Sequence, residues 1–178
     1  MANNAVSTVT VWSPDPGALA RVEAAVAAPD VDRRGLLRRT TSPGSVFSLE
    51  TIVPSGMDVD AWDWERAVQL WGTARPETDA TLDVRTPDRL VYRLVTAFAP
   101  PSDVLRALSA AHPGVVVHVV TTCESEYAST AWYLRGTTLR EEETGLDLTD
   151  EQWEDWDGEW DLPPRWAFAA ATARELAG

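Results

Sequence analysis

The chain has 178 residues, which suits one domain and is enough to bury a large hydrophobic core without disulfides or metals. Its single cysteine, Cys123, has no partner for an internal disulfide, and the first residues lack the basic and apolar regions of an export signal. No apolar run reaches the roughly 20 residues that a membrane-spanning helix needs. We therefore expect a soluble, cytoplasmic protein that does not bind membranes.

The net charge of -13 is concentrated near the C-terminus. Residues 1–140 contain 16 acidic residues and 13 arginines, whereas residues 141–178 contain 12 acidic residues and 2 arginines. Affinity for nucleic acids comes largely from clustered Lys and Arg, so this balance argues against direct nucleic-acid binding. We expect two units, a domain over residues 1–140 and an acidic, Trp-rich helical extension over residues 141–178.

The first quarter of the chain carries strand and helix signals in turn. Apolar residues alternate with polar ones around Val9–Val11, which predicts a strand, and Asp15 followed by Pro16 predicts the start of a helix. A loop is expected over residues 30–44. Apolar residues at alternating positions in residues 47–53 predict a second strand.

A helix and a hairpin follow, and we expect residues 54–88 to be an insertion in the domain. Apolar residues recur at the spacing of one helix face, which predicts an amphipathic helix that ends at Gly72: Trp64, Ala67, Val68 and Trp71. Residues 81–98 predict a hairpin that turns at residues 86–88. Its second strand has four apolar residues on one face, namely Leu90, Tyr92, Leu94 and Phe98.

The remaining elements complete an α+β pattern. After Pro100-Pro101, Ser102 or Asp103 is expected to cap a helix that runs to about Ala111. Residues 115–122 predict a central strand buried on both faces, and residues 131–135 a further strand. This order of elements predicts a ferredoxin-like fold, in which an antiparallel sheet carries helices on one face.

Three short motifs fall within this pattern. They are Leu70–Arg75 (LWGTAR), Thr96–Pro101 (TAFAPP) and Thr122–Glu124 (TCE). In order and position they resemble motifs of the YubB ferredoxin-like family, small proteins of bacterial plasmids and phages, with Leu70 and Ala74 in place of that family's Asn and Lys. The resemblance covers about residues 6–136. It implies a fold and a mobile-element origin rather than a reaction.

Few residues could support nucleophilic or metal chemistry. They are His112, His118, Cys123, Glu124 and Glu126. On one strand, His118 and Cys123 are an odd number of residues apart and should point to opposite faces. The histidines and the cysteine lack zinc-ligand spacing, and the chain has no lysine to activate a nucleophile. We expect no metal, no cofactor and no catalytic residue, although the many acids leave a glycosidase-like carboxylate pair open.

One candidate binding site is a cleft near Trp71, Thr73, Arg75 and Glu124. The motif around Trp71 could present an aromatic ring and a hydroxyl group to a ligand. The plain alternative is that Trp71 packs in the core and that Gly72 ends the helix. Under the first interpretation, the protein binds a small ligand or acts as an enzyme at this cleft.

The acidic extension provides the main functional prediction. Trp153, Trp156 and Trp160 share one face of a helix that Thr149 can cap, so we expect the indoles to pack on the domain. Six carboxylates are then expected to form a binding surface: Glu151, Glu154, Asp155, Asp157, Glu159 and Asp161. The alternatives are a helix that only increases solubility and an exposed indole stripe that is itself a partner site.

Together these patterns predict a non-catalytic interaction protein of phage or plasmid type. We expect its acidic surface to bind a basic protein partner, with inhibition by nucleic-acid mimicry as one form of that role. The alternative is a small-ligand-binding protein or enzyme that uses the cleft near Trp71, Thr73 and Glu124. The sequence does not indicate an oligomeric state.

Overall fold

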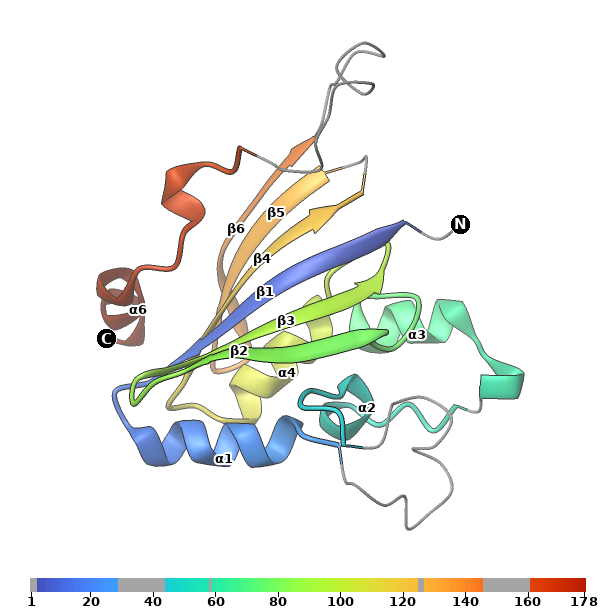
Figure 1. The fold of residues 1–178 in the computed structure, drawn as a ribbon, viewed down its shortest axis with the longest axis horizontal. Coiled ribbons are helices and arrows are strands. Elements are labelled where there is room, and N and C mark those ends of the chain that lie inside the picture. Colours follow the sequence, from blue (N-terminus) through green and yellow to red (C-terminus); the bar gives the residue numbers. More distant parts are fainter. Residues whose placement is uncertain (1–2, 29–43, 58, 125–126, 146–160) are drawn as a thin grey trace.

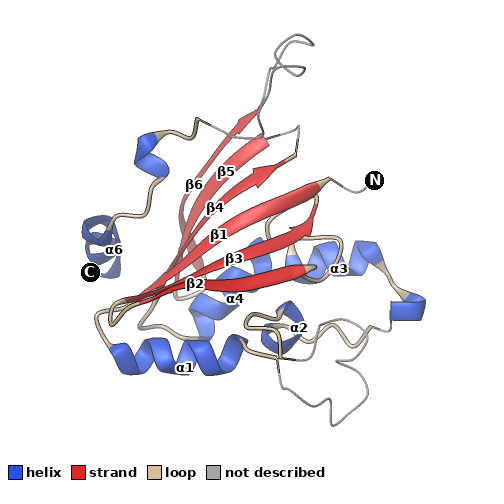
Figure 2. Ribbon diagram, in the orientation of Figure 1, coloured by secondary structure: helices blue, strands red, loops and turns tan. Residues whose placement is uncertain are grey.

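The computed structural model describes residues 3–28, 44–57, 59–124, 127–145 and 161–178. These residues form a six-stranded antiparallel sheet with helices packed against it (Figures 1 and 2), so the predicted α+β class is confirmed. The strands are β1 (Asn4–Trp12), β2 (Asp79–Arg85), β3 (Arg89–Ala97), β4 (Val116–Cys123), β5 (Tyr127–Leu134) and β6 (Thr137–Gly145). Their order across the sheet is β2-β3-β1-β4-β5-β6.

The helices are α1 (Pro16–Val26), α2 (Leu49–Ile52), α3 (Trp64–Trp71), α4 (Ser102–Ala111) and α6 (Ala170–Ala177). Short 3₁₀ helices lie at Val59–Ala61 and Pro164–Trp166. Among the helices of the described ranges, none combines the length and the apolar character needed to cross a membrane.

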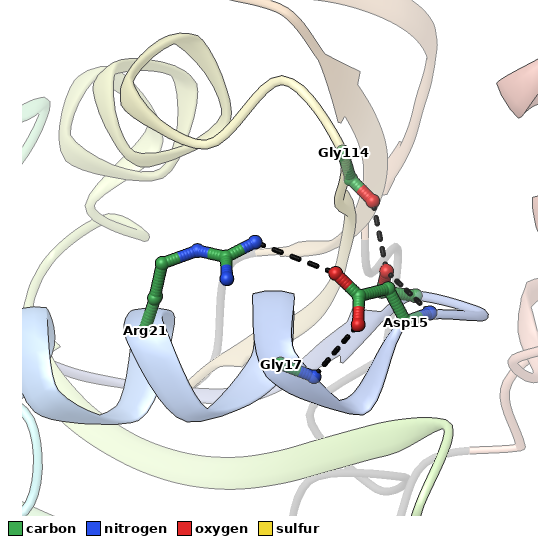
Figure 3. A network of polar contacts seen from close by, with 5 residues as sticks. Asp15, Gly17, Arg21 and Gly114 are labelled. Atoms are coloured by element: carbon green, nitrogen blue, oxygen red, sulfur yellow. Dashed lines mark hydrogen bonds and ion pairs between the residues drawn. The ribbon is translucent and has the colours of Figure 1, made fainter.

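Side chains of Asp15 and Ser13 form hydrogen bonds that fix the start of α1. The Asp15 carboxylate accepts a hydrogen bond from the Gly17 N–H at 2.8 Å and faces the exposed Arg21 guanidinium at 3.4 Å (Figure 3). Ser13 Oγ accepts from the Asp15 N–H and donates to the Gly114 carbonyl. These bonds confirm the predicted helix start and attach it to the turn before β4.

The two faces of the sheet bury different clusters. The larger core lies between the sheet and α1–α4, and it includes alternate residues of the central strands, such as Val9, Tyr92 and Val119. The smaller cluster lies on the opposite face and consists of Trp12, Val116, Trp132, Leu134 and Ala173, the last from α6. Because β4 contributes to both clusters, the prediction of a central strand buried on both faces is confirmed.

The predicted strand over residues 47–53 is wrong, because this segment contains the short helix α2. Ser48 Oγ accepts a hydrogen bond from the Thr51 N–H, and the buried Glu50 carboxylate accepts from the N–H and hydroxyl of Ser55. Such local side-chain bonds compete with a strand ladder for the backbone. Phe47 and Leu49 are buried as the alternating pattern suggested, but Phe47 lies in a bend before α2 and Leu49 is the first residue of that helix.

The predicted ends of α3 and α4 can be compared with the residues at which these helices begin and end. Asp63 caps α3 through the Arg66 N–H, and Gly72 ends it in the left-handed conformation, with φ of 82°, as predicted. For α4, the predicted cap at Ser102 or Asp103 is wrong by one or two residues. The helix already includes Ser102, so Pro101 occupies the cap position, and its ring has no polar atom that could form a capping hydrogen bond.

The edge strand β6 crosses the predicted boundary at residue 140. It pairs with β5 from Thr137 to Gly145, so the Glu141–Glu143 run belongs to the sheet and not to a helical extension. All nine residues of β6 are exposed. An exposed edge strand rich in charge gives no apolar alternation, which explains why the sequence pattern did not indicate it.

Candidate functional site

Two of the three sequence motifs meet where β3 ends and α4 begins. The Thr73 hydroxyl donates a hydrogen bond of 2.8 Å to the Ala97 carbonyl. A Cβ atom on Gly72 would lie 3.0 Å from the Ser102 nitrogen and 3.3 Å from the Pro100 oxygen. Position 72 therefore needs glycine both for its left-handed backbone and for this close approach. The C-terminal end of α3 is pressed against the turn that leads into α4.

Phe98 lies in this turn and has an unusual backbone conformation, with φ of 68°. Its N–H donates to the Asn3 carbonyl, and its own carbonyl accepts hydrogen bonds from the Tyr127 hydroxyl at 3.0 Å and the Cys123 thiol at 3.4 Å. Cys123 belongs to the third motif, so all three motifs converge here. A bulky residue rarely has positive φ, and such strain often occurs at functional sites.

The predicted placement of Phe98 on the face of Leu90, Tyr92 and Leu94 is wrong. The strand ends at Ala97, and the left-handed turn rotates the Phe98 ring out of the core, so that the residue is 46% exposed. The hydrogen bonds to residues 3, 123 and 127 hold it there. They connect segments far apart in the sequence and leave no trace in the local pattern.

A groove lies beside Phe98 and has a volume of about 460 Å³. We call it the aromatic groove. Its lining residues come from α3, from the segments before and after this helix, and from the turn after β3: Trp62, Trp64, Val68, Gly72, Ala74, Arg75, Ala97, Phe98 and Ala99. Trp64 is 60% exposed and Val68 41%. The volume falls within the range of small-ligand sites.

The polar groups of the aromatic groove are nearly all engaged. The Trp62 indole N–H donates to the Ala74 carbonyl at 2.9 Å, and the Ala99 carbonyl accepts from the Thr96 hydroxyl at 2.7 Å. Arg75 is the charged residue of the lining, and it is exposed. The groove therefore presents aromatic and aliphatic surface next to one guanidinium group.

The four residues of the predicted cleft have different roles. Trp71 is fully buried, and its indole N–H donates to the Val53 carbonyl at 2.8 Å. Thr73 is buried and is not among the residues that line the groove. Glu124 lies at the end of β4, where its carboxylate accepts hydrogen bonds from the main chain and side chain of Asn4. Of the four, Arg75 is the residue that lines the aromatic groove.

Most of the predicted acidic surface falls outside the described residues. This applies to Glu151, Glu154, Asp155, Asp157 and Glu159, whereas Asp161 is described and exposed. On β6, the Glu142 carboxylate accepts hydrogen bonds from Arg165 and from the Trp166 indole, and these bonds lower its pKa. Glu141 and Glu143 line a separate polar pocket of about 180 Å³.

Of the other candidate residues, His118 and Cys123 are buried, and Glu126 lies outside the described residues. His118 is buried on the face covered by α6, where it stacks on Trp132 at 4.1 Å and bonds to the Thr130 hydroxyl at 2.9 Å. Burial lowers the pKa of His118 to about 4, so it is neutral at pH 7. Cys123 belongs to the opposite face, as predicted. No group of three potential metal ligands occurs in the described part of the chain.

The sequence analysis did not identify the exposed residues of the aromatic groove, which are Trp64, Val68 and Phe98. A usable signal was present, because the apolar stripe of α3 begins at Trp64, directly after the cap. Ala67 and Trp71 of this stripe are buried, whereas Trp64 and Val68 are exposed and line the groove.

Comparison of this chain with models of known protein families, with curated proteins and with solved structures finds no match. The resemblance of Leu70–Arg75 and the two later motifs to the YubB family stays a prediction. We therefore infer the function of this site from the positions of its own residues.

Proposed function

We propose that this protein is a non-catalytic binding protein and that the aromatic groove holds its ligand. One observation carries the proposal: Trp64, Val68 and Phe98 expose apolar side chains around a single cavity. Contiguous exposed apolar surface on a soluble protein usually marks an interaction site, and tryptophan is favoured at such sites.

The construction of the groove supports a preformed site. Phe98 is held in its left-handed conformation by three hydrogen bonds, and Trp62 is fixed through its indole N–H. A ligand would meet side chains that already have their bound positions, which reduces the entropic cost of binding.

The lining residues also favour binding over catalysis. Among the described residues, the lining contains no carboxylate, imidazole, thiol or side-chain hydroxyl group. Nucleophilic and acid–base mechanisms need such groups within hydrogen-bond reach of one another. Arg75 alone can position an anion, but it cannot exchange a proton at neutral pH.

The proposal can be tested with indole as a neutral probe. Trp64→Ala should weaken indole binding about tenfold, because one aromatic contact contributes roughly 0.5–1.5 kcal/mol beyond its buried area. Leu139→Ala removes an apolar side chain of β6 that is 37% exposed, and it serves as the matched control. NMR titration gives both affinities. Equal binding by the wild type and the Trp64 variant, or no binding at all, would reject the site.

We also propose that the fold is of the ferredoxin-like type and related to the YubB proteins of mobile elements. The order β1-α1-β2-β3-α4-β4, with strands arranged β2-β3-β1-β4, supports this assignment. The segment with α2 and α3 is then an insertion, and β5 and β6 extend the sheet. The presence of β6 moves the end of the domain from residue 140 to at least residue 145.

A second candidate function is binding of a basic protein partner through acidic surface. The observation that favours it is the exposed edge strand β6, which presents Glu141 and Glu143 beside a polar pocket. Higher salt screens exposed charges, so a complex formed in this way should weaken steadily as the salt concentration rises. A partner whose affinity does not change with salt would exclude this surface.

A further inference from the structure

We infer that the ligand of the aromatic groove is a small aromatic carboxylate, an inference that rests on the proposed function of this site. The ligand would place its ring among Trp62, Trp64 and Phe98, and its carboxylate on the Arg75 guanidinium. Three features of the groove favour such a ligand: its size, its hydrogen-bonded polar groups and the charge of Arg75.

The size of the groove suits one ring system with a short substituent. A volume of about 460 Å³ lies in the lower half of the range for small-molecule pockets. The indole rings of Trp62 and Trp64 and the ring of Phe98 border the cavity. Aromatic rings favour another ring in offset-stacked or edge-to-face arrangements.

The polar groups of the groove disfavour a cationic or donor-rich ligand. The carbonyl groups of Ala74, Ala97 and Ala99 each already accept a side-chain hydrogen bond. A ligand rich in N–H groups would lose its hydration without gaining strong acceptors. The part of the lining that the structure describes also has no carboxylate that could pair with a cation.

The charge of the groove favours an anion. Arg75 is the charged lining residue, and it forms none of the ion pairs found among the described residues. A guanidinium group presents two parallel N–H donors that match a carboxylate. This positive group stands out in a chain of net charge -13, which as a whole repels anions. An anion would therefore bind here through local contact and not through the overall field.

The test compares two probes of nearly equal shape, indole-3-acetate and indole-3-acetamide. The wild type should bind the acetate about two- to fivefold more tightly, as expected for a solvent-exposed ion pair. Arg75→Gln should remove this preference and leave acetamide binding unchanged. Arg93→Gln, which removes an exposed arginine of β3, is the matched control and should keep the preference. Unchanged thermal unfolding of both variants shows that they are folded.

The outcomes separate this inference from the proposed function. If both probes bind equally and Trp64→Ala weakens both, the groove is a binding site but the carboxylate preference is wrong. If the preference persists in Arg75→Gln, the anion is held elsewhere, and the inference is overturned. If neither probe binds, both proposals fail. Much tighter binding of the peptide Gly-Gly-Trp would assign the groove to a chain terminus and overturn the small-molecule ligand.

Discussion

The two ends of α3 carry the same type of residue in opposite environments. Trp71 at the C-terminal end is 0% exposed, whereas Trp64 at the N-terminal end is 60% exposed. Both belong to one apolar stripe, since seven residues make almost two helical turns. The C-terminal end is covered by the start of α4, which approaches Gly72 closely. The N-terminal end borders the aromatic groove.

This difference shows what an amphipathic pattern can and cannot indicate. The pattern identifies the apolar face of a helix, but the rest of the chain decides how much of that face is covered. Where other elements pack against only part of the apolar face, the rest of that face is available to a ligand. In α3 the uncovered part is the wall of the aromatic groove.

The largest expected effect is at the buried end. Trp71→Ala should lower the free energy of unfolding by about 3–5 kcal/mol, because it removes a fully buried ring from the core. It also leaves the Val53 carbonyl without the indole hydrogen bond. Urea denaturation measures this loss. A loss below about 1 kcal/mol would mean that Trp71 is not the structural residue described above.

The smallest expected effect is at the open end. Trp64→Ala should change the free energy of unfolding by no more than about 0.5 kcal/mol, since most of this side chain is already in water. The same urea titration applies, and the pair of variants forms a direct contrast along one helix. If both substitutions destabilise the protein equally, the distinction between a structural end and a binding end of α3 is wrong.

Local signals predicted much of the fold. Asp15 and Gly72 mark the ends of α1 and α3 through contacts within a few residues, so the sequence is sufficient to identify them. The segment at residues 47–53 was predicted incorrectly because Ser48 and Glu50 bond to nearby backbone, which overrides the alternation. The edge strand β6 could not be predicted from apolar periodicity, because all of its residues are exposed.

The candidate site was predicted only in part. Arg75 was identified and lines the aromatic groove, whereas Trp71 and Thr73 are buried and do not line it. The exposure of Phe98 depends on hydrogen bonds to Asn3 and Tyr127, which are distant in the sequence. No local pattern contains that information. The predicted acidic helix lies outside the described residues, apart from Asp161 at its end.

The most direct test of the central claim is to locate a bound aromatic probe. Nuclear Overhauser contacts between indole-3-acetate and the isotope-labelled protein would identify the nearest side chains. We predict contacts to the Trp64 and Phe98 rings and to the Val68 methyl groups, with none to Val84 or Leu139, which are exposed apolar residues outside the groove. Contacts to Val84 or Leu139, without contacts to Trp64 and Phe98, would contradict the account.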